Sequence, residues 1–120
     1  MKHSPEFLQL VDEAKDQVKE VSVEDARQQQ QKGALLIDVR EDNEWEAGHA
    51  TNAIHLGKGI IERDIVEKVP NKNAELILYC GGGFRSVLSA YNLQKMGYTN
   101  VYSMAGGWRS WKDAGAPVEP

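Results

Sequence analysis

Short apolar runs that alternate with helix-like segments constrain this 120-residue chain more than any other feature. Four such runs occur, at residues 34–39, 53–56, 75–80 and 100–104. Short runs of this kind are typical of strands in a parallel sheet that helices cover on both faces. Strands that alternate with helices indicate an α/β domain. We therefore predict a mainly parallel central sheet of about five short strands, flanked by helices on both faces.

Capping residues and helical spacing predict the helices between these runs. Residues 5–19 carry apolar side chains at helical spacing, with Ser4 as the N-cap. Ser22 caps a second helix that we expect from Val23 to Lys32. The tail beyond residue 115 is expected to be extended. The remaining helices are expected over residues 40–48, 60–69 and 86–96, with a last turn or helix that begins at 106–107.

Composition limits the classes of partner. A chain of this length forms one compact domain, and its net charge of −4 argues against nucleic acid or an anionic membrane as the main partner. The first residues contain no apolar signal region, and no stretch reaches the length of a membrane span. A lone cysteine forms no internal disulfide, so we expect a cytoplasmic protein. An anionic ligand would have to be held by a local positive field.

The only cysteine, Cys80, stands at the end of the third apolar run and precedes three glycines and a helix start. Ligands bind at the carboxyl ends of strands in open α/β sheets. The backbone N–H groups of residues 81–86 can converge there, because glycine accepts positive φ angles. A helix dipole alone contributes roughly 0.3–1 kcal/mol, whereas keeping a thiol ionised near neutrality takes about 2.7 kcal/mol. We therefore expect an ordered loop whose amides point inward at a nucleophilic sulfur.

The segment Cys80–Ser86 resembles the active-site loop of rhodanese-type sulfurtransferases, whose pattern is Cys-x-x-Gly-x-Arg followed by Ser or Thr. The chain departs from that family at Ala50–Ala53, where we expect an altered turn. The resemblance implies a rhodanese-like domain over residues 21–120 and leaves residues 1–20 as an N-terminal helical appendage. Further positions similar to the family follow in the same order: Asp38-Val39-Arg40, Glu44-Trp45, Gly48-His49, Gly97-Tyr98, Gly106-Gly107, Trp111 and Gly115-Ala116-Pro117.

The resemblance implies a two-step sulfur transfer through Cys80. The thiolate takes the sulfane sulfur of a small anionic donor such as thiosulfate and becomes a persulfide. A thiophilic acceptor then removes that sulfur: cyanide in vitro, and a thiol or a thioredoxin-like protein in the cell. The implied reaction needs no metal, organic cofactor or separate base, so His49 is expected to be a hydrogen-bonded structural residue. The spacing of the three histidines and the cysteine also lacks the pattern of a zinc site.

The loop residues are the main candidates for the site. For Arg85 two interpretations stay open, bidentate contact with an oxyanion of the donor and a surface ion pair. Ser86 is expected to cap its helix, although its hydroxyl could also reach Cys80. Phe84 is expected to wall one side of the entrance. Cys80 is the catalytic nucleophile, and the residues expected to bind the donor are Gly81, Gly82, Gly83, Phe84, Arg85 and Ser86.

Four charged residues outside the loop are candidate supporting groups. Asp38 and Arg40 are expected in an ion-pair network near the loop, with Glu44 as a further member. The resemblance places Lys58 and Arg63 near the mouth of the site, where they would attract anionic donors. A solvated surface role is the alternative for these two cations.

Two other functions stay open. A thiol-based phosphatase or arsenate reductase of the same fold has five residues between cysteine and arginine, whereas four separate Cys80 from Arg85. The smaller loop fits one sulfur atom better than a phosphoryl group, which favours sulfur transfer. A non-catalytic rhodanese-like module that binds a partner protein is the other alternative, although such modules tend to lack the loop cysteine.

Overall fold

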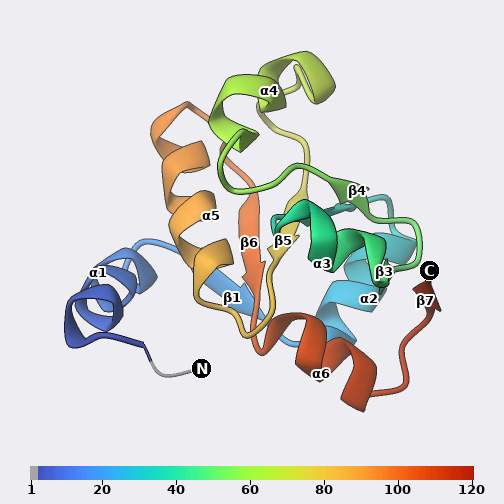
Figure 1. Ribbon diagram of the computed structural model, residues 1–120. Coiled ribbons are helices and arrows are strands. Elements are labelled where there is room, and N and C mark those ends of the chain that lie inside the picture. The colour runs from blue at the N-terminus through green and yellow to red at the C-terminus, as the bar shows by residue number, and fades with distance from the viewer. Residues whose placement is uncertain (1–2) are drawn as a thin grey trace.

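The computed structural model describes residues 3–120, and a five-stranded sheet forms its centre (Figure 1). Every neighbouring pair of strands in this sheet is parallel. The predicted α/β class, with a mainly parallel sheet of about five short strands, is confirmed. The strands lie in the order β1 (Lys19–Val21), β6 (Val101–Met104), β5 (Leu76–Tyr79), β2 (Leu35–Asp38) and β4 (Ile54–His55).

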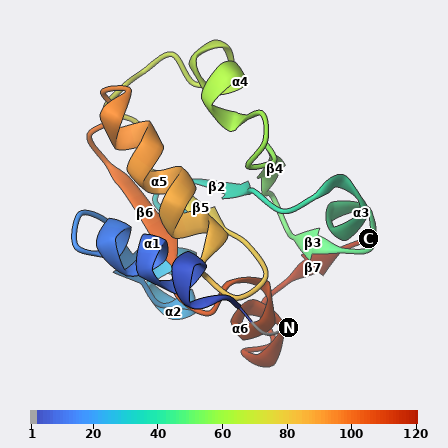
Figure 2. The same cartoon turned by 60° about the vertical axis from the view of Figure 1, so that its left-hand side comes forward.

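Helices cover both faces of the sheet, as predicted (Figure 2). Two separate apolar clusters hold the layers together, because successive side chains of a strand point to opposite faces. Leu78 and Cys80 belong to the cluster on the α5 side, whereas Ile77 and Tyr79 belong to the other. A short helix, α3 (Asp42–Glu46), follows β2. On one face lie α1 (Pro5–Lys15), α4 (Ile61–Lys68) and α5 (Arg85–Lys95), and on the other α2 (Val23–Gln31) and α6 (Gly107–Asp113).

Side-chain caps determine where the first two helices begin, as the sequence predicts. Ser4 Oγ accepts a hydrogen bond from the Phe7 N–H at 3.1 Å, and Ser22 Oγ accepts one from the Asp25 N–H at 3.1 Å. Such caps satisfy N–H groups that have no partner within the first turn. The prediction that the first helix reaches residue 19 is wrong. The helix ends at residue 15, because residues 19–21 pair with β6 and are therefore extended.

Three short strands are absent from the sequence-based prediction. β1 has the sequence Lys-Glu-Val and is largely exposed, so no apolar run marks it. β3 (His49–Ala50) and β7 (Val118–Glu119) form a separate antiparallel pair that fastens the C-terminal tail. Lys19 and Glu20 of β1 lie in the central sheet. The division into an appendage of residues 1–20 and a domain of residues 21–120 stays a prediction.

The fold brings the cysteine loop to the carboxyl edge of the sheet. β5 ends at Tyr79, the loop occupies residues 80–84, and α5 begins at Arg85. β6 is the neighbouring strand, and α6 begins three residues after it, so its first turn lies beside the loop. Within residues 3–120, no helix combines the length and the apolar character that crossing a membrane requires.

Candidate active site

The Cys80 sulfur lies in a cradle formed by its own loop. The residue is 1% exposed, and its Sγ accepts hydrogen bonds from the backbone N–H groups of Gly83 at 3.2 Å and Ser86 at 3.4 Å. Ser86 Oγ lies 3.5 Å from the same sulfur. Hydrogen bonds to the charged form of a group favour that form. The surroundings of the sulfur are therefore suited to a thiolate.

The three loop glycines differ in what they contribute. Of the three, Gly83 alone has a positive φ, +100°, and a Cβ there would lie 3.1 Å from the backbone nitrogen of Gly106. At Gly81 a Cβ would lie 3.2 Å from Arg85 Nη2, whereas at Gly82 it would meet open space. Gly83 also donates one of the two amide hydrogen bonds to the sulfur. The backbone conformation that turns the amides inward therefore depends mainly on Gly83.

The first turn of α6 holds two loop carbonyls away from the sulfur. The Trp108 N–H donates to the carbonyl oxygen of Cys80 at 2.7 Å, and the Arg109 N–H donates to that of Gly81 at 3.2 Å. Gly107 lies so close that a Cβ on it would overlap the Cys80 carbonyl. Sequence reasoning missed this contact, for which the paired glycines at 106–107 were the signal. Because these carbonyls are bonded to α6, they point away from the sulfur, and the hydrogen bonds to the sulfur come from the Gly83 and Ser86 amides.

Ser86 has the second of the two roles that the sequence leaves open for it. α5 begins at Arg85 with Phe84 as its N-cap, and no side chain caps it, so the expected capping role of Ser86 is wrong. The residue lies inside the first turn, where its N–H is bonded to the sulfur. Its Oγ is also 2.8 Å from Ser103 Oγ. Sequence reasoning missed Ser103, although a serine in an otherwise apolar and aromatic strand was a signal.

Arg85 forms a bidentate ion pair with Glu44 of α3. The Nη1–Oε1 and Nη2–Oε2 distances are 2.9 Å and 3.2 Å, and both side chains are 31% exposed. The hydrogen bond from Arg85 lowers the pKa of Glu44 below its ordinary value, and the same bond raises the pKa of Arg85. Glu44 is therefore the ion-pair partner of Arg85, and it is not part of the ion pair between Asp38 and Arg40.

Asp38 and Arg40 form a buried ion pair at the end of β2. Arg40 Nη2 lies 2.8 Å from Asp38 Oδ2 and also donates to the Gly48 carbonyl at 2.7 Å. The guanidinium lies over the Trp108 ring, 4.7 Å from its centroid. Trp108 belongs to the turn of α6 that binds the loop carbonyls. The pair thus connects the end of β2 to the element that orients the cysteine loop.

Lys58 and Arg63 make local contacts. Arg63 pairs with Asp64 on the surface of α4, with 2.7 Å between Nε and Oδ1. The backbone N–H of Lys58 donates to the Val39 carbonyl at 2.9 Å. Among residues 3–120, no ion pair or hydrogen bond joins either side chain to the cysteine loop. Their attraction of anionic donors stays a prediction.

Phe84 packs against the N-terminal helix. The centroid of its ring lies 4.9 Å from that of His3 and 6.4 Å from that of Phe7, and both contacts are edge-on. Lys15 Nζ lies 5.7 Å from the centroid of the Phe84 ring. Residues of α1 and the residue His3 before it therefore cover the side chain that the sequence assigns to the wall of the entrance.

Trp45 of α3 stacks with two histidines. Its ring centroid lies 3.4 Å from that of His49 and 5.0 Å from that of His55, at interplanar angles of 2° and 8°. His49 Nδ1 is 3.0 Å from the Trp45 carbonyl, and His55 Nε2 is 2.8 Å from the Arg40 carbonyl. His49 is therefore hydrogen-bonded within the structure, and His55 has the partner that the sequence did not identify. The stack helps to place α3, which carries Glu44.

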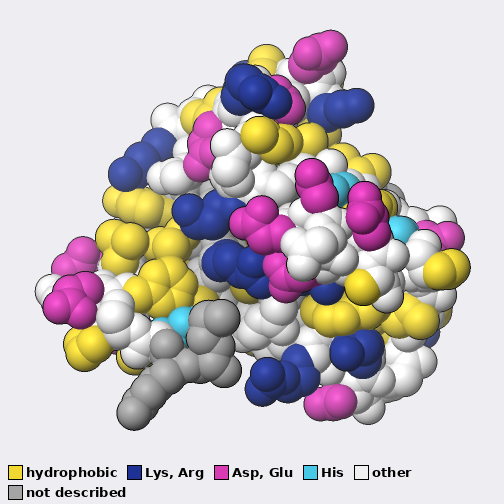
Figure 3. Space-filling model, viewed as in Figure 1, with side chains coloured by type: hydrophobic (Ala, Val, Ile, Leu, Met, Phe, Trp, Pro, Cys, Tyr) yellow, Lys and Arg dark blue, Asp and Glu magenta, His cyan; other side chains and the backbone are white. Residues whose placement is uncertain are grey.

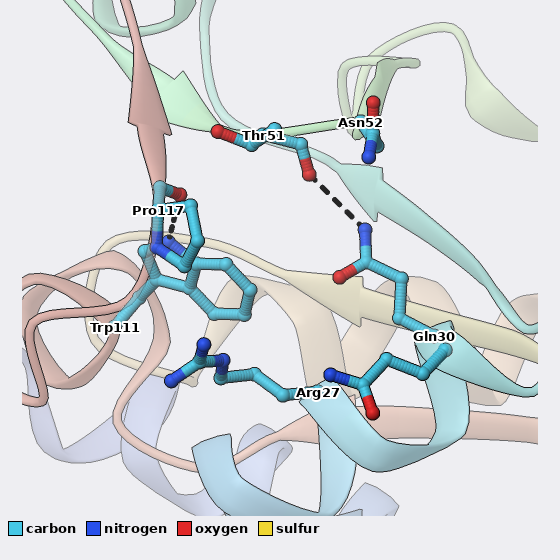
Figure 4. Close-up of a pocket in the computed structure, with 7 residues that line it drawn as sticks. Arg27, Gln30, Thr51, Asn52, Trp111 and Pro117 are labelled. Carbon is cyan, nitrogen blue, oxygen red and sulfur yellow. Dashed lines mark hydrogen bonds between the residues drawn. The ribbon is translucent and has the colours of Figure 1, made fainter.

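A pocket of about 210 Å³ lies on the face of the sheet that α2 and α6 cover (Figure 4). Two hydrogen bonds join residues that line it, from Gln30 Nε2 to the Thr51 carbonyl at 3.1 Å and from Trp111 Nε1 to the Pro117 carbonyl at 2.8 Å. No residue of the cysteine loop lines this pocket, so it is separate from the Cys80 cradle. The residues that line it are Arg27, Gln30, Gln31, Thr51, Asn52, Trp111 and Pro117.

Charge on the surface is mixed. Lys and Arg side chains alternate with Asp and Glu side chains over the face that Figure 3 shows. The net charge of −4 adds no general attraction for an anion. Within residues 3–120, no group of three or more His, Cys, Asp or Glu side chains is placed to hold a metal ion. The positive field at Cys80 is therefore local, and it comes from the two backbone N–H donors and from the Arg85 guanidinium, which also interacts with the sulfur.

The chain is similar to known sequences over most of its length. The family model of the rhodanese-like domain matches residues 22–114. The chain is 31% identical over 101 residues to the thiosulfate sulfurtransferase GlpE of Haemophilus influenzae. This match covers 84% of the chain and 94% of that protein.

Solved structures share the fold. A Rhodopseudomonas palustris protein of unknown function, described as a possible tyrosine phosphatase, superposes with a TM-score of 0.83 and 26% identity. That similarity covers 99% of this chain and 98% of the other, and so includes α1. A thiosulfate sulfurtransferase from Pseudomonas aeruginosa superposes with a TM-score of 0.77 and 25% identity, over 84% of this chain and 20% of that one.

Proposed function

Because this chain belongs to the rhodanese-like domain family, we propose that it is a sulfurtransferase that acts through a persulfide on Cys80. The donor is a small anionic sulfane-sulfur compound such as thiosulfate. The acceptor is cyanide in vitro and a thiol or a thioredoxin-like protein in the cell. One observation carries the proposal: two backbone N–H groups donate to the buried sulfur of the only cysteine.

The reaction proceeds in two displacement steps. The Cys80 thiolate attacks the outer sulfur of thiosulfate, a new S–S bond forms, and the old S–S bond breaks as sulfite leaves with the electron pair. The acceptor nucleophile then attacks the terminal sulfur of the persulfide, and the electron pair of that S–S bond returns to Cys80. The N–H donors of Gly83 and Ser86 stabilise the negative sulfur before the first step and after the second.

Arg85 is proposed to contact the donor while it stays paired with Glu44. A guanidinium carries five N–H donors, and the bidentate pair uses two of them. The remaining donors can bind an oxyanion of thiosulfate. Glu44 then fixes the direction in which Arg85 points, so the two open interpretations of this arginine are compatible with each other.

Phosphatase activity is the second candidate, because the structural neighbour from Rhodopseudomonas palustris is described as a possible tyrosine phosphatase. Four residues, Gly81–Phe84, separate the nucleophile from Arg85 in this chain. The short loop favours transfer of a single sulfur atom. We further propose a cytoplasmic location, where a lone cysteine stays reduced.

The test is the formation of thiocyanate from thiosulfate and cyanide, with Cys80→Ser as the key variant. We expect activity in the wild type, none in Cys80→Ser, and a protein heavier by one sulfur atom after the wild type is treated with donor. Ser89→Ala is the control, since Ser89 is buried on α5 and its hydroxyl has no hydrogen-bond partner among residues 3–120.

Two outcomes would contradict sulfur transfer. Hydrolysis of an aryl phosphate without thiocyanate formation would indicate the phosphatase. If donor-treated protein carries no extra sulfur and binds a partner protein equally well with Cys80→Ser, the chain would instead be a non-catalytic binding module.

A further inference from the structure

Two buried hydroxyls form a row with the Cys80 sulfur. Ser103 Oγ lies 2.8 Å from Ser86 Oγ, which lies 3.5 Å from Cys80 Sγ. Ser86 and Ser103 are 0% exposed, so water does not complete their hydrogen bonds. Ser103 stands opposite Leu78 in the parallel pair of β6 and β5, on the sheet face that α5 covers. Among residues 3–120, the contact with Ser86 is the hydrogen bond of its side chain.

The number of protons in this row depends on the state of the sulfur. Three atoms in a row share two hydrogen bonds. With a thiolate the row holds two protons, so Ser103 donates to Ser86, Ser86 donates to Cys80 and every donor is satisfied. With a thiol the row holds three protons, and one of them lacks an acceptor. A buried donor without an acceptor is costly, so the row favours the ionised sulfur.

We propose that Ser103 is a positioning residue that acts through Ser86 to keep a hydroxyl proton directed at the Cys80 sulfur. With the sulfur ionised, Ser103 donates to Ser86 Oγ, and the sulfur is the acceptor that remains for the Ser86 hydroxyl. Hydrogen bonds in such a chain also polarise one another, which strengthens the bond to sulfur. The inference rests on the proposed function for its catalytic consequence: the same proton stabilises the thiolate that leaves when the acceptor removes the outer sulfur.

No charged group around the site bonds the two hydroxyls of this row, but the Arg85 guanidinium lies close enough to the Cys80 sulfur to interact with it. The charged groups on the neighbouring elements are paired with one another or exposed, and within residues 3–120 none is hydrogen-bonded to Ser86 Oγ or Ser103 Oγ. A change at Ser103 therefore leaves the ion pairs of the site in place. These groups are Arg85 of α5, Glu44 of α3, Asp38 and Arg40 at the end of β2, and Arg109 of α6.

The chain supplies a matched control for Ser103. Ser89 is likewise 0% exposed and lies on α5, one turn beyond Ser86. Its Oγ has no hydrogen-bond partner in the described part of the chain. Ser89→Ala therefore removes a buried hydroxyl near the same core without removing a hydrogen bond.

The experiment measures the rate at which iodoacetamide alkylates Cys80 as a function of pH. The proteins compared are the wild type, Ser86→Ala, Ser103→Ala, the double variant and Ser89→Ala. We expect Ser86→Ala to slow alkylation at neutral pH about threefold to tenfold, the factor of one ordinary hydrogen bond to the sulfur. We expect Ser103→Ala to slow it by a smaller factor of about two, because only the polarisation of that bond is lost, and both variants should move the rise in rate to higher pH. The double variant should match Ser86→Ala alone, and Ser89→Ala should match the wild type.

Several results would overturn the proposal. One is that Ser103→Ala is alkylated at the wild-type rate and with the wild-type dependence on pH. Another is an equal loss from Ser103→Ala with and without the Ser86 hydroxyl, because Ser103 would then act independently of Ser86. If Ser103→Ala does not fold, Ser103→Thr keeps the hydroxyl, and a folded Ser103→Thr that has lost the wild-type profile overturns the proposal as well. Alkylation needs no sulfur donor, so its outcome stays distinct from a failure of sulfur transfer.

Discussion

Gly83→Ala tests whether the backbone of the cysteine loop activates the sulfur. Gly83 has φ +100°, and a Cβ would lie 3.1 Å from the nitrogen of Gly106. A side chain in such a conformation costs about 1–2 kcal/mol, and the loop can relieve that strain by turning the Gly83 N–H away from Cys80 Sγ. Loss of one preorganised donor lowers catalysis at most about 10²–10³-fold. Sulfur is a weaker acceptor than an oxyanion, so we expect a loss of about tenfold to a hundredfold in kcat/KM.

Gly97→Ala separates strain from activation. Gly97 has nearly the same φ, +103°, a Cβ there would meet open space, and the residue lies at the far end of α5 from the loop. Urea unfolding should show a loss of about 1–2 kcal/mol in both variants, whereas thiocyanate formation should fall only in Gly83→Ala. Equal activity in the two variants would refute the reasoning, because the Gly83 amide would then contribute nothing to the sulfur. Gly82 has no positive φ, and a Cβ there would meet open space, so Gly82→Ala should have the free energy of unfolding of the wild type.

Two further predictions concern residues outside the loop. Glu44→Gln should lower the free energy of unfolding by about 1 kcal/mol at neutral pH, since one side of the ion pair with Arg85 is lost. The pKa of Glu44 is lowered in the folded state, so its contribution is present above the ordinary pKa of a glutamate and is lost as pH falls through the folded value. Urea unfolding should therefore show wild type and variant converging in acid, and a gap that widens in acid would contradict this. Val11→Ala on α1 should lower the free energy of unfolding by about 2 kcal/mol, because Val11 is buried in the same cluster as Cys80. Leu10→Ala, at an exposed position of the same helix, should lower it by less than about 0.5 kcal/mol in the same thermal or urea unfolding experiment. Equal effects of the two substitutions would mean that α1 is not part of the folded core.

The sequence allowed prediction of the elements whose signals are local. The four apolar runs became β2, β4, β5 and β6. For β2, β5 and β6, burial on both faces of the sheet requires continuous apolar sequence, whereas β4 is a half-buried edge strand. Ser4 and Ser22 mark helix starts through bonds that span three residues. β1, β3 and β7 could not be predicted in this way. They are two or three residues long, and their own composition does not mark them as strands. They are extended because they pair with segments that are distant in the sequence.

The residues of the site also divide into those with a local sequence signal and those placed by distant contacts. Cys80 and its glycines are consecutive in the chain, so their pattern is visible in the sequence. The partner of Arg85 is 41 residues away, and a carboxylate at such a separation is one of many that the sequence offers. Ser103 is likewise placed by the β5–β6 register, which brings it under the start of α5. Ser86 was expected at the start of a helix over residues 86–96, whereas α5 begins at Arg85 and places Ser86 inside its first turn.

The properties of the cysteine loop arise from two adjacent strand–helix connections rather than from the loop alone. The β5–α5 connection directs the N–H groups of Gly83 and Ser86 at the sulfur, while the β6–α6 connection binds the carbonyls of Cys80 and Gly81. Each peptide group has its N–H and its carbonyl on opposite sides, so the Cys80 and Gly81 carbonyls that point to α6 turn the N–H groups of Gly81 and Gly82 away from α6, and these carbonyls need partners of their own. The backbone N–H groups at the start of α6 supply those partners. This requirement explains why Gly107 must lack a side chain: only a bare backbone approaches the Cys80 carbonyl closely enough for the Trp108 N–H to bond it.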